Sequence, residues 1–162
     1  IDFYKYAKSK GVKPIIGCEV YVSTRSRFEK QKGLDGYRHL VLLCKDIKGY
    51  QNLIKLVSCG FTEGFYSKPR VDRELLEKYH DGIIALSACL AGEITQSILK
   101  GNYEEAKQTA LWYNNVFGKG NYYLELQDHG INEQKLVNPQ LVRLSKETGI
   151  PLVATNDMSD RR

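Results

Sequence analysis

Residues 15–22 read Ile15-Ile16-Gly17-Cys18-Glu19-Val20-Tyr21-Val22, an apolar run that carries a single carboxylate. Apolar and β-branched residues in a short run of this kind predict a strand that is buried in a sheet. A buried ionised carboxylate is costly unless it is paired or bound to a metal. Glu19 therefore has two interpretations: a salt-bridged residue at a strand edge, or part of a functional site.

Polar residues also mark the ends of three further predicted strands. His39 opens one strand, Cys89 follows a second, and Asp157 follows a third. The mouth of a sheet or barrel, where strands end, is the usual position of functional residues in α/β proteins. Together with Glu19, these three side chains predict one site at such a mouth.

Two other residues are possible neighbours of this site. Glu125 is a second carboxylate within an apolar strand, and His129 lies in the turn that follows. Mixed Glu, His and Asp ligands suit Zn²⁺, Mn²⁺ or Fe and a hydrolytic centre. Taken singly, His39 also fits a structural hydrogen-bonding role, and Cys89 also fits a small packing residue. No GxxxxGK[ST], GxGxxG or GxSxG sequence is present, which excludes sites of those types.

Positive charge is concentrated in the first fifty residues. The net charge of the chain is +5, and residues 1–50 hold eleven Lys and Arg against five Asp and Glu. Such a charge permits DNA as a partner without establishing it, since a basic loop either contacts nucleic-acid phosphates or is only solvated. The most basic loop contains Arg25, Arg27, Lys30 and Lys32.

Length, cysteine content and hydropathy restrict the class of protein. A chain of 162 residues is long enough for one domain with its own core. The four cysteines form no CxxC pair, which argues against a zinc ribbon, and a disulfide framework is not expected in a chain of this size. There is neither a signal peptide nor an apolar run that could span a bilayer. We therefore expect a cytoplasmic protein with no membrane partner.

Helical and strand patterns alternate along the chain. Asp72 is expected to cap a helix, and Pro139 to begin or kink the last one. The alternation predicts an α/β fold of parallel βαβ units, either an open doubly wound sheet or a barrel. The predicted helices cover 1–10, 50–59, 72–79, 91–99, 103–117 and 133–148, and the predicted strands cover 15–22, 39–44, 83–86, 122–126 and 152–155.

Taken together, these segments resemble consecutive blocks of a known family. In order, and over nearly the whole chain, they are similar to the polymerase-and-histidinol-phosphatase (PHP) domain at the N-terminus of bacterial DNA polymerase III alpha subunits. The resemblance implies part of a distorted seven-stranded βα barrel with a metal site at its mouth. The blocks that carry it are Lys13–Val22, His39–Leu43, Asn52–Ser58, Phe61–Tyr66, Leu86–Glu93, Leu124–Gly130 and Val153–Asp157.

The resemblance also implies which residues hold the metal. By position within the blocks, the ligands present are Glu19, His39, Cys89 and Asp157, and His129 ranks as a neighbour. The family begins with a strand bearing a His-x-His pair and continues to an Asp-His-Gly turn. Neither motif is in this chain, so the domain is expected to lack its first strands and about half of its ligands.

The end of the chain departs from the family pattern as well. Ser159 stands where the family usually has a histidine, and Asp160-Arg161-Arg162 is unlike the family's continuation. We therefore assign residues 1–157 to a partial PHP domain and residues 158–162 to an atypical tail or boundary.

For the parent protein, the resemblance implies replicative, template-directed DNA synthesis with Mg²⁺ in a palm domain beyond this chain. Its partners would be DNA, the sliding clamp and the proofreading subunit. The PHP part would be a metal-dependent 3′–5′ exonuclease, a degenerate scaffold or a docking platform, and the isolated fragment is expected to be inactive. The alternatives are a free-standing PHP phosphoesterase of the histidinol-phosphatase type and a non-catalytic basic interaction module. The aromatic block Phe61–Tyr66 favours the polymerase branch.

Overall fold

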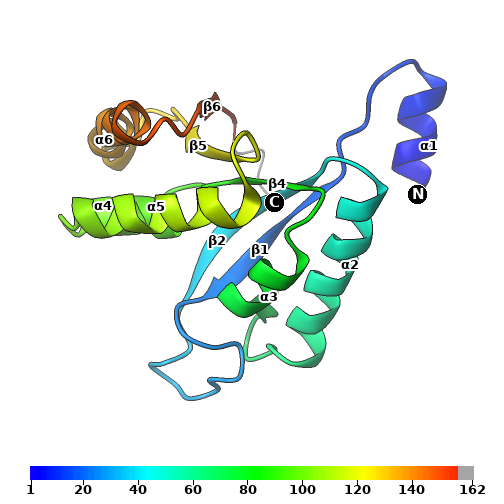
Figure 1. Ribbon diagram of the computed structural model, residues 1–162, viewed down its shortest axis with the longest axis horizontal. Coiled ribbons are helices and arrows are strands. Elements are labelled where there is room, and N and C mark those ends of the chain that lie inside the picture. Colours follow the sequence, from blue (N-terminus) through cyan, green and yellow to red (C-terminus); the bar gives the residue numbers. More distant parts are fainter. Residues whose placement is uncertain (157–162) are drawn as a thin grey trace.

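One sheet of six strands organises residues 1–156, the part of the chain that the computed structural model describes (Figure 1). The order across the sheet is β3-β1-β2-β4-β5-β6. The mixed α/β class is therefore confirmed, and β3 is an addition, since no strand was predicted at its two residues. The strands are β1 (Gly17–Ser23), β2 (Tyr37–Cys44), β3 (Arg70–Val71), β4 (Ile83–Leu86), β5 (Tyr122–Leu126) and β6 (Leu152–Ala154).

Five of these strands run in the same direction, and β2 alone is reversed. β1 pairs in parallel with β3, and β5 pairs in parallel with both β4 and β6. β2 is antiparallel to both of its neighbours, β1 and β4. The prediction of parallel βαβ units is therefore wrong around β2. The physical reason is that residues 24–36 contain no helix to carry the chain back across the sheet, so β1 and β2 pair as a hairpin.

Helices cover one face of the sheet, and the other face carries the predicted site. Val20 and Leu40 are buried in the core cluster that the helices share with the sheet. Because side chains alternate along a strand, Glu19 and His39 point to the opposite face. Figure 1 shows α1 set apart from the sheet, joined to it by an extended segment. The helices are α1 (Asp2–Ser9), α2 (Ile47–Thr62), α3 (Arg73–Tyr79), α4 (Glu93–Leu99), α5 (Tyr103–Phe117) and α6 (Asn132–Thr148).

Side-chain caps explain where two of the helices begin. The Asp46 carboxylate accepts a hydrogen bond from the backbone of Gly49 at 2.9 Å, so α2 starts before its predicted position. Asp72 caps α3 as predicted, with its carboxylate accepting from a backbone N–H of the first turn. α6 runs through Pro139 without ending there, since its buried stripe continues on both sides of the proline.

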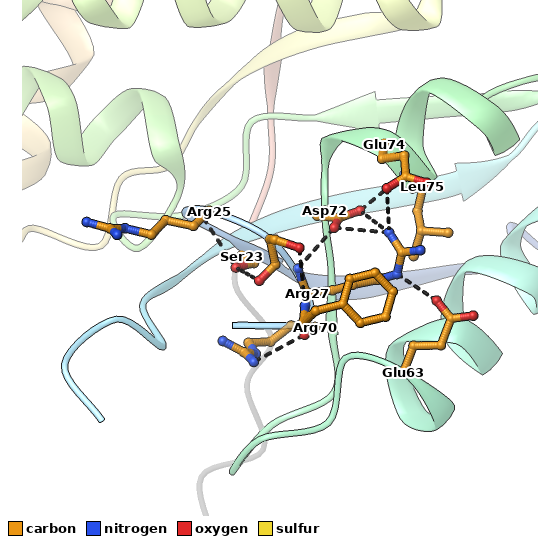
Figure 2. A network of polar contacts seen from close by, with 10 residues as sticks. Ser23, Arg25, Arg27, Glu63, Arg70, Asp72, Glu74 and Leu75 are labelled. Carbon is orange, nitrogen blue, oxygen red and sulfur yellow. Dashed lines mark hydrogen bonds and ion pairs between the residues drawn. The ribbon is translucent and has the colours of Figure 1, made fainter. Parts of the chain in front are cut away.

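An ion-pair network centred on the buried pair of Arg27 and Asp72 fixes the loop 24–36 to α2 and α3 (Figure 2). The side chain of Arg27 is buried, and its Nη1 lies 2.9 Å from Oδ1 of Asp72. Its Nε contacts Glu63 at 2.6 Å, and Nη1 also contacts Glu74 at 3.2 Å. Desolvation opposes the charge of Arg27, but the bonds to these three carboxylates outweigh it and raise the pKa of the guanidinium.

The burial of Arg27 corrects one prediction made for this loop. Its guanidinium is buried and paired with the buried carboxylate of Asp72, so it does not present its charge to a nucleic-acid phosphate. Arg25, Lys30 and Lys32 are exposed, and their contact with nucleic acid stays a prediction. Arg70, also buried, donates to the backbone carbonyl of Glu29 at 2.7 Å and thereby fixes the far part of the loop.

A surface ion-pair cluster joins α5 to α6 and centres on Glu147. Its carboxylate accepts hydrogen bonds from Lys107 Nζ at 2.9 Å and from Arg143 Nε at 2.8 Å. These bonds lower the pKa of Glu147 from 4.5 to about 2, and the bond from Lys107 makes the largest contribution. A carboxyl whose pKa is lower in the folded state stabilises the fold at pH values above its unfolded pKa. For Glu147, that contribution is lost as the pH falls from 4.5 to about 2.

We therefore expect Glu147→Gln to lower the melting temperature at pH 6, and we expect this deficit to disappear as the pH approaches 2. Thermal melts of both chains at a series of pH values measure the difference. The exposed Glu77 provides the control, since Glu77→Gln should give no such pH-dependent deficit. A deficit for Glu147→Gln of the same size at pH 6 and pH 2 would contradict the assignment.

Candidate metal centre

Glu19 lies in the middle of β1, on the face of the sheet that the helices do not cover. The expectation that this carboxylate is buried is wrong, because 43% of its side chain is exposed. The neighbouring Val20 points to the helices and is buried, so β1 is covered on one face and open on the other. The site interpretation of Glu19 does not depend on burial, because an accessible carboxylate is also a competent metal ligand.

The reversal of β2 brings His39 to Glu19. His39 stands near the start of β2, and the start of an antiparallel strand lies at the same edge as the ends of its neighbours. Its Nδ1 lies 3.0 Å from Oε1 of Glu19. In an all-parallel sheet, the start of β2 would lie at the opposite edge, and the two side chains would be far apart.

A strained turn after β4 places Cys89 next to the same histidine. Ala88 has a φ of +64°, in the left-handed region that residues other than glycine seldom adopt. The turn is fixed to β2, because the backbone N–H of His39 donates to the carbonyl of Ala91 at 3.1 Å. As a result, Sγ of Cys89 lies 3.6 Å from Nδ1 of His39.

The three donor atoms converge as metal ligands do. One ligand atom from each of Glu19, His39 and Cys89 lies within 4.8 Å of the other two. Around a tetrahedral zinc, ordinary bond lengths put sulfur and nitrogen ligands about 3.6 Å apart, and nitrogen and oxygen ligands about 3.4 Å apart. The corresponding separations here are 3.6 Å and 3.0 Å. The oxygen, nitrogen and sulfur donor set therefore fits a divalent transition metal.

Comparison with known proteins shows the family of this chain. The model of the PHP domain family matches residues 1–129, which is most of the chain. The chain belongs to the PHP domain family. The open six-stranded sheet is accordingly part of a PHP barrel.

Relatives of this PHP domain are subunits of a DNA polymerase. It is 49% identical over 162 residues to a DNA polymerase III subunit alpha of Deinococcus radiodurans and 50% identical over 160 residues to that of Borreliella burgdorferi. The matches cover 97% of this chain but only 12% and 14% of those relatives. The Thermus aquaticus subunit alpha is 49% identical, with 97% of this chain and 13% of the relative covered. The chain is thus a PHP domain segment that matches a small part of DNA polymerase III alpha subunits.

The remaining predicted site residues of the PHP domain lie apart from the cluster or outside the described residues. Asp157 is one of the residues beyond 156 and stays a predicted ligand. His129 is exposed, and its Nδ1 lies 3.0 Å from the amide nitrogen of Gln134, its neighbour in α6. Within residues 1–156, His129 does not join the group of Glu19, His39 and Cys89.

Glu125 is buried and lines a small cavity together with Cys89. The cavity has a volume of about 10 Å³, close to that of one water molecule. One carboxylate oxygen of Glu125 bonds to Gln127 and Thr155, while the other is buried with no hydrogen-bond partner within the described residues. Glu125 is therefore a neighbour of Cys89 in the interior, and its role at the metal site stays a prediction.

The other cysteines of the PHP domain are packing residues. Cys18, Cys44 and Cys59 are free thiols that pack against the hydrophobic core. Burial, and to a smaller extent the charge of Glu19, raises the pKa of Cys18, while burial and Asp46 raise that of Cys44.

Two tyrosines beside the cluster were not predicted from the sequence to belong to the site. Tyr21 and Tyr37 lie on the same face of the hairpin as Glu19 and His39. A signal was present, because Tyr21 follows Glu19 by two residues and Tyr37 precedes His39 by two, the period of one strand face.

Within residues 1–156, none of the helices is long and apolar enough to cross a bilayer.

Proposed function

We propose that this PHP domain binds a divalent metal ion through Glu19, His39 and Cys89 and removes nucleotides from the 3′ end of a DNA strand. The observation that carries the proposal is the convergence of the three donor atoms within 4.8 Å. Asp157 is the proposed fourth ligand, and the donor set favours Zn²⁺, Mn²⁺ or Fe. When bound, such an ion supplies an activated water and stabilises charge on phosphoryl oxygens.

The chain's own residues have defined tasks in this proposal. The carboxylate of Glu19 and the thiolate of Cys89 supply the negative charge that balances the ion, and Nδ1 of His39 lies between them. The partial exposure of Glu19 and His39 leaves an open side on which a phosphodiester can approach. The core packed beneath the sheet fixes the strands that carry the ligands.

The parent protein and its partners belong to the proposal as well. Because the relatives are named DNA polymerase III subunit alpha, we infer that the parent chain is a cytoplasmic DNA-directed DNA polymerase. Its partners are DNA, the sliding clamp and a proofreading subunit, and its polymerase chemistry uses Mg²⁺ in a palm outside this chain. The isolated segment is expected to be inactive.

The test uses the full-length natural chain that contains this segment. We expect it to contain divalent metal by mass spectrometry and to release nucleotides from a 3′-labelled oligodeoxynucleotide in the absence of nucleoside triphosphates and pyrophosphate. Chelation should abolish the release, and Mn²⁺ or Zn²⁺ should restore it. Glu19→Gln should remove the hydrolysis and leave primer extension intact, whereas Glu133→Gln, at an exposed position of α6, should leave both intact. Hydrolysis that survives in Glu19→Gln would refute the proposal.

A further inference from the structure

Two tyrosines and a histidine form an aromatic cluster on the open face of the β1–β2 hairpin. The ring centroids of Tyr21 and Tyr37 are 4.8 Å apart, and those of Tyr21 and His39 are 5.2 Å apart. The rings of Tyr37 and His39 are nearly parallel, with an interplanar angle of 6°. All three side chains are partly exposed, so the cluster is not sealed inside the core. The cluster shares His39 with the candidate metal centre.

The hairpin register orders these rings relative to the metal ligands. Glu19 pairs with Val41, Tyr21 with His39, and Ser23 with Tyr37. Successive residues on one face of a strand are about 7 Å apart. The aromatic rings therefore extend from the ligand pair toward the loop 24–36, which projects beyond the ends of β1 and β2 in Figure 1.

Positive charge accompanies the rings along this path. Lys68 is exposed, and its Nζ lies 5.6 Å from the ring centroid of Tyr21. The loop 24–36, between β1 and β2, adds three exposed cations, Arg25, Lys30 and Lys32. Aromatic rings that stack with bases, combined with cations that follow the phosphates, are the features by which proteins bind single-stranded nucleic acid. In duplex DNA the bases are stacked on one another, so their faces are not available to these rings.

We propose that Tyr21, Tyr37 and Lys68, here named the tyrosine platform, bind the last bases of a single DNA strand and direct its 3′ end to the metal centre. This proposal rests on the proposed function and specifies its substrate as an unpaired 3′ end. The rings receive bases, and Lys68 receives a phosphate. The three residues are binding and positioning residues, and they take no part in the chemical step.

Kinetics of the full-length chain with two substrates test the platform. We expect Tyr21→Leu and Tyr37→Leu each to raise the KM for a single-stranded oligodeoxynucleotide by about 5- to 150-fold, the range for loss of one stacked base. The rate of hydrolysis of bis(p-nitrophenyl) phosphate, an ester without bases, should be unchanged. The amount of bound metal should be unchanged as well. Tyr21→Phe should restore the KM, because it retains the ring. Tyr50→Leu, at an exposed position of α2, is the matched control.

Photocrosslinking provides a readout that does not require hydrolysis. An oligodeoxynucleotide with 5-iodouracil next to its 3′ end should crosslink to the peptides that carry Tyr21 or Tyr37. Crosslinks to those peptides in a chain that hydrolyses neither substrate would support the platform and refute the proposed nuclease. Normal hydrolysis, with unchanged KM in both tyrosine variants and with crosslinks elsewhere, would overturn the platform and leave the nuclease standing.

Discussion

Replacing Asp72 with alanine is expected to destabilise the chain by roughly 3–5 kcal/mol, the usual cost of breaking a buried ion pair. Asp72 is only 3% exposed, and its carboxylate accepts hydrogen bonds from both the backbone N–H and the guanidinium of Arg27 (Figure 2). It also caps α3 through the N–H of Leu75. Alanine therefore leaves a buried guanidinium short of a carboxylate and a helix start without its cap.

Urea denaturation of the chain, followed by circular dichroism, measures this loss. Asp46 is a matched control, because it is also an N-cap aspartate, but it is exposed and caps α2. Asp46→Ala should cost only about 1 kcal/mol, the usual value of an N-cap. If Asp72→Ala does not fold, Asp72→Asn retains the cap and measures the loss of charge alone. Equal losses in Asp46→Ala and Asp72→Ala would show that the buried pair adds nothing.

The second large effect is expected at His39, the central donor of the candidate metal centre. Its Nδ1 lies 3.0 Å from the Glu19 carboxylate and 3.6 Å from the Cys89 sulfur, so its loss removes the ligand between the other two. We expect His39→Ala to weaken metal binding by more than about 100-fold, since even residues that only support a ligand contribute about 10–100-fold. Metal content per full-length chain after dialysis against a weak chelator measures the effect.

A matched histidine and a spectroscopic signal make this test specific. His80 ends α3, away from the site, and His80→Ala should retain the metal. Loading with Cd²⁺ should give a thiolate absorption band that Cys89→Ser removes and that substitution of Cys59 leaves unchanged. Unchanged metal content in His39→Ala, with native circular dichroism, would refute the metal-centre assignment.

Local sequence signals predicted most of the elements and the candidate ligands. The strands 83–86 and 122–126 have their predicted bounds, and Asp72 caps α3 as expected. These features depend on hydrophobic period and on side-chain caps, which act within a few residues. Residue types at predicted strand ends also marked Glu19, His39 and Cys89 as one group, and the structure brings them together.

Features that depend on distant partners were not predictable in the same way. The charge of Arg27 suggested solvent or nucleic acid, but the carboxylate of Asp72, much later in the chain, pairs with it in the interior. Likewise, the apolar neighbours of Glu19 suggested burial, whereas only one face of β1 is covered by helices. A sequence pattern gives the polarity of a residue but not the identity of what packs against it.

The sequence by itself determined the α/β class, the order of the elements other than β3, and the chemical nature of the donors. Tertiary structure alone decided that β2 runs against the other five strands. That reversal brings His39, at the start of its strand, to the edge where Cys89 follows the end of β4. Strand direction depends on pairing between segments far apart in the chain and on the packing of the finished sheet, and neither leaves a local periodic signal.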